Sequence, residues 1–68
     1  MSQDFEDQFL PKIVEILMLA DGFKPDKVLI SRSIAQGTNS LRLIAWIDLA
    51  RKILNDIEPQ LQDKNEDG

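Results

Sequence analysis

The chain of 68 residues contains no cysteine and no histidine. The first absence excludes disulfides, and the two together remove the usual ligands of a structural zinc site. A chain this short buries only about 60% of its unfolded surface, so small domains commonly depend on disulfides, a metal or oligomerisation. Oligomerisation is therefore the route to stability that the composition favours.

The same absences argue against an enzyme. General acid–base catalysis near neutral pH usually uses histidine, and nucleophilic catalysis uses cysteine, or serine or threonine beside a base. Four hydroxyl groups lie close together in the middle of the sequence, but hydroxyls around a turn are typical of helix caps; they belong to Ser31, Ser33, Thr38 and Ser40. We expect no catalytic residue, no cofactor and no small-molecule substrate.

Nothing in the sequence indicates export or a membrane. The N-terminal residues Asp4, Glu6 and Asp7 are acidic where a secretory signal is basic, and no apolar run approaches the ~20 residues of a membrane span. The polar face of the C-terminal helical segment contains Asp48 and Asp56, which weakens any attraction to an anionic bilayer. We predict a cytoplasmic protein without a membrane partner, and the lack of cysteine fits a reducing compartment.

The net charge is −4, and it is unevenly distributed. Residues 1–7 carry −3, residues 24–52 carry +4, and residues 53–68 carry −4. The overall acidity argues against a protein that coats nucleic acid, although it leaves room for a local basic patch.

The first apolar segment predicts a helix over residues 4–20. Acidic residues in its first turn suit the helix dipole, and Gly22 is placed for a left-handed C-terminal cap. Pro11 allows two interpretations: a new helix begins there, or one helix bends there. Between Pro11 and Asp21, only Lys12 and Glu15 are polar. This part of the helix must therefore be packed against other protein surface on nearly all sides.

The second segment predicts a helix over residues 25–36. Pro25 is favourable at a helix start, Asp26 suits the first turn, and Gly37 follows the end. Ile30 and Ile34 share one helical face, but residues 27–30 alone also fit a short strand.

The third segment has the clearest pattern and predicts a helix over residues 40–58. Apolar residues recur at alternating spacings of four and three, which is typical of an amphipathic helix. This seam consists of Leu43, Ile47, Ala50, Leu54, Ile57 and Leu61. One of the three residues 38–40 caps the start.

The expected fold class is therefore all-α, a small three-helix bundle with helices at about 4–20, 25–36 and 40–58, completed by oligomerisation. The short connections predict consecutive helices that run roughly antiparallel. We assign residues 1–61 to a single helical domain and residues 62–68 to a disordered acidic tail, because apolar side chains end at Leu61.

That tail contains half of a calcium-binding motif. Positions 63–68 match the first six positions of an EF-hand loop, but the chain stops before the bidentate glutamate and the second helix. Calcium requires six to eight oxygen ligands, so we predict no metal site.

The function that this composition favours is a helical protein-interaction or regulatory module. It would act as a homodimer or as a subunit of a larger complex. Half of the residues from 8 to 61 are apolar, and so small a domain cannot bury all of them within one chain. The residues expected at the protein interface are Leu10, Val14, Leu17, Met18, Leu41, Ile44 and Trp46.

The alternative is a helix-turn-helix-like DNA-binding transcriptional regulator. Residues 25–36 and 40–58 would form the two helices, joined by a turn that contains Gly37. Its candidate nucleic-acid contacts are Arg32, Asn39, Ser40 and Arg42. The apolar residues in the first turns of the third segment argue against it, because few side chains there can reach a base edge.

Overall fold

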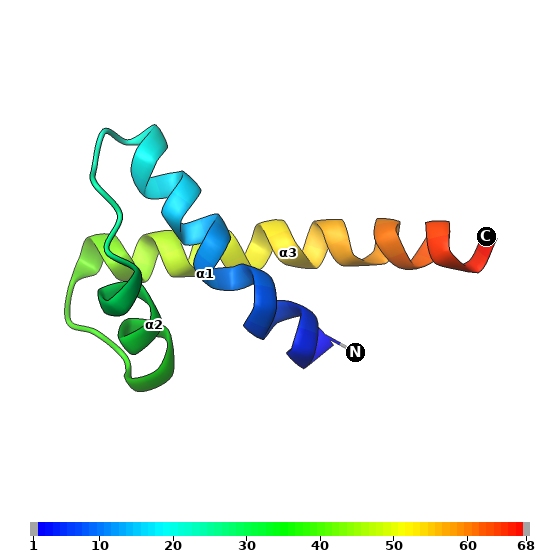
Figure 1. The fold of residues 1–68 in the computed structure, drawn as a ribbon, viewed down its shortest axis with the longest axis horizontal. Coiled ribbons are helices and arrows are strands. Elements are labelled where there is room, and N and C mark those ends of the chain that lie inside the picture. Colours follow the sequence, from blue (N-terminus) through cyan, green and yellow to red (C-terminus); the bar gives the residue numbers. More distant parts are fainter. Residues whose placement is uncertain (1, 68) are drawn as a thin grey trace.

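The alternation of apolar segments and turn residues produces three helices. The computed structural model describes residues 2–67, with side chains described for residues 4–61. Its helices are α1 (Ser2–Ala20), α2 (Lys27–Gln36) and α3 (Leu41–Asp67), and no strand occurs between residues 2 and 67 (Figure 1). The predicted all-α class is confirmed, and residues 27–30 belong to a helix.

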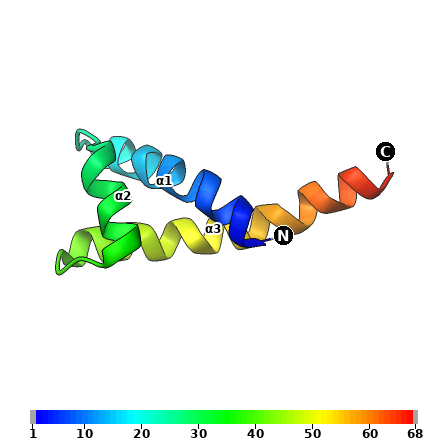
Figure 2. The ribbon, with the colours of Figure 1, turned by 60° about the horizontal axis from the view of Figure 1, so that its bottom comes forward.

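The helices do not all pack as the sequence predicts. α1 and α3 run in opposite directions and cross obliquely, and this contact is the most extensive in the fold (Figure 1). α2 lies across the end of this pair, so the prediction that consecutive helices are antiparallel is wrong for α2 (Figure 2). The C-terminal part of α3 extends past α1, which gives a body of 41 × 24 × 17 Å.

α1 is one continuous helix through Pro11. It ends in a Schellman motif: the Phe23 N–H donates to the Met18 carbonyl at 2.8 Å, and the Gly22 N–H donates to Leu19 at 3.0 Å. Gly22 has a φ of 82°, which confirms the predicted left-handed cap. Across residues 2–67, no helix has both the length and the apolarity that crossing a membrane requires.

α2 begins later than predicted. Asp26 is extended, with φ −123° and ψ 102°, and its carboxylate accepts a hydrogen bond from the Leu29 N–H at 3.1 Å. Asp26 is therefore the N-cap, and Pro25 precedes the helix instead of opening it. Gly37 ends α2 as predicted, with a φ of 92°.

α3 begins at Leu41 because Ser40 is its N-cap: the Ser40 hydroxyl accepts from the Leu43 N–H at 3.3 Å. The helix continues past the predicted end at residue 58, through Pro59 to Asp67. The side chains of residues 62–68 lie outside the described part, and the disordered tail stays a prediction.

The core lies where α1 and α3 cross. It contains nine buried apolar residues: Leu10, Val14, Met18, Ile30, Leu43, Trp46, Ile47, Ala50 and Leu54. Four residues of the predicted α3 seam are among them, from Leu43 to Leu54. α2 contributes a single apolar side chain to this set, Ile30, beside the buried polar Ser33. α1 and α3 thus supply nearly all of the core.

Candidate protein-interaction surface

The structure divides the predicted interface residues into two groups. Leu10, Val14, Met18 and Trp46 are buried within the chain, so their assignment to an interface is corrected: they form the core. Leu17 packs against that core and is partly buried. Leu41 and Ile44 are exposed.

Trp46 illustrates why a predicted interface residue lies in the core instead. Its indole Nε1–H donates to the Asp21 carboxylate at 3.3 Å, and its ring meets Phe23 edge-on with centroids 5.3 Å apart. A large aromatic side chain is stable in a core when its polar atom has a partner, as here. Trp46 therefore ties the end of α1 to α3.

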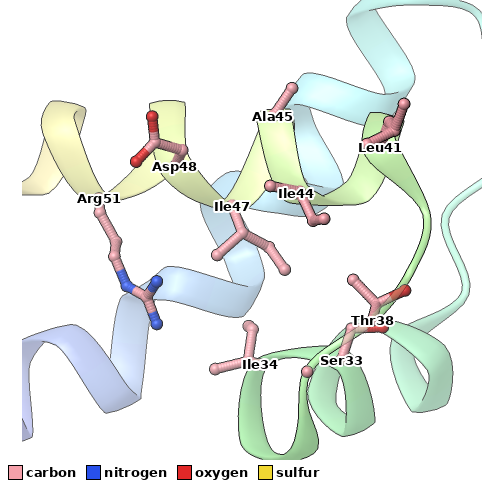
Figure 3. Close-up of a pocket in the computed structure, with 10 residues that line it drawn as sticks. Ser33, Ile34, Thr38, Leu41, Ile44, Ala45, Ile47, Asp48 and Arg51 are labelled. Carbon is pink, nitrogen blue, oxygen red and sulfur yellow. The ribbon is translucent and has the colours of Figure 1, made fainter.

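The exposed group borders a groove between α2 and α3. Ile44 and Ile47 point from α3 toward Ile34 of α2, and Arg51 closes one end (Figure 3). The groove has a volume of about 430 Å³. It exists because the contact of α2 with α3 is the least extensive in the fold, so apolar side chains on facing helices remain separated.

Leu41 and Ile44 are exposed apolar residues that line this groove. Leu41 is 83% exposed and Ile44 is 46% exposed. Ala45 is exposed on the same helix and also lines the groove. Adjacent exposed apolar side chains beside a hollow are typical of an interaction site.

The charged side chains at the groove have opposite signs. Arg51 lies 4.0 Å from Glu6 of α1, measured from Nε to Oε2, and Asp48 lies 3.4 Å from the ammonium of Lys52. Asp48 and Arg51 are three residues apart, so they lie on one face of α3. The edge of this groove therefore has mixed charge.

The predicted interface did not include Ile34, Ile47, Asp48 or Arg51. The sequence does show that Ile30 and Ile34 share a helical face, and Ile47 belongs to the seam. No local pattern shows that α2 crosses α3 and leaves a gap, so this part of the surface required the tertiary structure.

The four residues of the DNA-binding alternative do not form one free basic surface. The Ser40 hydroxyl caps α3, and the Arg42 guanidinium lies 4.5 Å above the centre of the Phe23 ring. Arg32 and Asn39 are exposed, on α2 and on the turn respectively. DNA binding stays a prediction, and two of its four residues have intramolecular contacts.

Among the described residues, no group of three or more acidic side chains is arranged to hold a metal ion. The half EF-hand motif at 63–68 lies outside the described side chains, so the prediction that it binds no calcium stays open to experiment.

Comparison with protein-family models, with curated proteins and with solved structures found no match to this chain.

Proposed function

We propose that this chain is a non-enzymatic, helical protein-interaction module that acts as a homodimer joined through the groove between α2 and α3. The observation that supports this proposal is the exposure of Leu41 and Ile44 at a groove whose lining is partly apolar. Burying such side chains is favourable by about 25 cal/mol per Å² of apolar area.

The mixed charge of the groove edge favours a second copy as the occupant. In a two-fold dimer the same surface serves both subunits, so each charge can lie opposite its complement when acid and base share one face. Asp48 and Arg51 meet this condition on α3. A DNA-binding surface would instead carry mainly basic residues, because they neutralise the phosphates.

The test is analytical ultracentrifugation of the unmodified protein at tens of micromolar. We expect a dimer, and we expect Leu41→Asp to shift the protein toward monomer, because the introduced charge would be buried at the interface. Leu41 is exposed in the single chain, so the circular dichroism spectrum of the variant should be unchanged.

Leu19→Asp is the matched control. Leu19 is an exposed leucine of α1 that does not line this groove. This variant should remain a dimer. A monomeric unmodified protein would contradict the homodimer, and loss of the dimer in both variants would place the interface elsewhere.

A further inference from the structure

The second helix, α2, has the weakest packing in the fold. It has ten residues, a length at which an isolated helix is only marginally stable in water. Ile30 is its single buried apolar side chain, and its contact with α3 is the least extensive between any two helices here. Elements with few buried apolar side chains separate from a protein at a lower free energy than its core helices do.

The turns at the two ends of α2 leave it free to move. Gly22 and Gly37 have φ angles of 82° and 92°, and nothing lies within 4 Å of the position that a Cβ atom would take at either glycine. Glycine changes its backbone angles at little steric cost. α2 spans from α1 to α3 across one end of the molecule, so changes at its two turns shift it relative to both (Figure 2).

A group of side chains ties the connection before α2 to α3. The Asp21 carboxylate accepts a hydrogen bond from the Trp46 indole at 3.3 Å. The Phe23 ring meets the Trp46 ring edge-on, with centroids 5.3 Å apart, and the Arg42 guanidinium lies 4.5 Å above the centre of the Phe23 ring. We call this group the latch; it consists of Asp21, Phe23, Arg42 and Trp46.

The latch reaches α2 through a short and stiff connection. Only Lys24 and Pro25 separate Phe23 from Asp26, the N-cap of α2. Proline fixes its own φ at about −65° and restricts the residue before it, so this connection has little freedom. The position of Phe23 against α3 therefore limits where α2 begins. Leu29, in the first turn of α2, lines the same hollow as the latch residues.

We propose that α2 is a separately releasable element and that the latch holds it at its distance from α3. With the latch closed, Ile44 and Ile47 face Ile34 across the groove between α2 and α3 (Figure 3). When Phe23 leaves Trp46, α2 separates from α3 and the groove opens. The α1–α3 pair stays folded, because these two helices supply nearly all of the core.

In the homodimer, this movement couples the groove to assembly, a consequence that rests on the proposed function. A contact through the groove uses side chains of α2 and α3 together, so it forms only when the two helices keep their separation. A partner that binds only the closed arrangement stabilises it. Dimer formation therefore holds α2 closed, and the latch makes the closed arrangement the ground state of the single chain.

Amide hydrogen exchange of the full chain, measured residue by residue by NMR, tests the release of α2. Once released, a helix of ten residues frays, and its amides exchange. In the unmodified protein, the amides of residues 31–36 should exchange at least about tenfold faster than those of Val14 in α1 and Ala50 in α3, each relative to its rate in an unfolded chain.

Two matched truncations assign this opening to the latch. Phe23→Ala should raise the exchange rate of the α2 amides by about tenfold, because the closed state loses an aromatic pair and a cation–π contact that the open state lacks. Phe9→Ala removes a ring that packs between α1 and α3, a contact that remains when α2 opens. This control should raise the exchange of Val14 and Ala50 but leave the α2 amides unchanged.

Two further variants keep the test decisive if Phe23→Ala does not fold. Phe23→Tyr keeps the ring and should retain the slow exchange of α2. Arg42→Ala changes an exposed residue and removes only the cation above the ring, so it should raise α2 exchange by a smaller factor.

Equal exchange of the α2, Val14 and Ala50 amides in the unmodified protein would overturn the proposal, because the molecule would then open only as a whole. An equal response of the α2 amides to Phe9→Ala and Phe23→Ala would also overturn it.

The coupling to assembly has a separate readout. Exchange of the α2 amides should slow as the protein concentration rises through the range in which the dimer forms. A dimer that leaves α2 exchange unchanged would contradict the coupling. If the unmodified protein is monomeric, the proposed homodimer fails, and the exchange of the variants still decides whether the latch holds α2.

Discussion

The structure gives Arg42 a different role from the one that the sequence suggests. In the sequence it is a basic residue just after a turn, where a DNA-binding helix would begin. In the structure its guanidinium packs over Phe23, which also contacts Trp46. A cation over an aromatic face contributes about 0.5–1 kcal/mol at an exposed site. Its described contact is thus with the loop that follows α1.

Ile30 and Val28 give a matched pair for testing the core. Both are β-branched and both belong to α2, but Ile30 is fully buried and Val28 is 65% exposed. Ile30→Ala should lower the free energy of unfolding by about 2–5 kcal/mol, because it removes packed methyl groups and leaves a cavity. Val28→Ala should change it by less than about 0.5 kcal/mol. Urea denaturation followed by circular dichroism measures both, and equal effects would contradict the placement of α2.

At the level of the elements, the helix ends depend on a few polar side chains and glycines. Asp26 and Ser40 cap the starts of α2 and α3, and both bond to the N–H three residues ahead. Gly37, with φ 92° and ψ 167°, adopts a conformation that only glycine adopts readily. The connection between α2 and α3 is therefore determined locally.

Asp26→Ala should destabilise the protein by about 1 kcal/mol, since α2 loses the acceptor for the Leu29 N–H. Asp26→Ser retains a capping oxygen and should recover most of this loss. Thermal denaturation of the two variants beside the unmodified protein gives the comparison. If the serine variant were as unstable as the alanine variant, the cap would not be the cause.

At the level of the whole molecule, the apolar part of the sequence ends before α3 does. Leu61 is the last residue that lines a hollow between α1 and α3, and no apolar residue follows it. The C-terminal end of α3 extends away from α1 and α2 (Figure 1).

Truncation after Gln62 should therefore change the melting temperature by no more than about 2 °C, well below the shift expected for a loss of 1 kcal/mol in a domain of this size. Differential scanning calorimetry of the full and truncated chains tests this. A larger decrease would mean that residues 63–68 pack against the folded domain.

DNA binding has its own test, because phosphate contacts release counterions and weaken steeply with salt. With a net charge of −4 and Arg42 packed on Phe23, we expect no duplex binding at either about 50 or 200 mM salt. A gel-shift titration measures it. Binding at the lower concentration that disappears in an Arg32→Ala, Arg42→Ala variant would support the alternative instead.

The sequence by itself determined the number of helices and the buried face of α3, but not whether Pro11 interrupts α1 or where α3 ends. Spacings of four and three along residues 43–54 place the buried side chains on one face of α3. Gly22 and Gly37 end α1 and α2. Both effects depend on residues close together in the sequence, so the sequence alone shows them. The tertiary structure alone decided which apolar residues remain exposed. Met18 and Ile16 lie in the same apolar run, yet Met18 is buried and Ile16 is exposed. Likewise, the oblique crossing of α1 over α3 covers Leu54 and leaves Leu61 partly exposed. The periodicity of a helix shows which residues form its apolar face, but not the angle at which a neighbouring helix crosses that face. That angle determines which apolar residues stay uncovered.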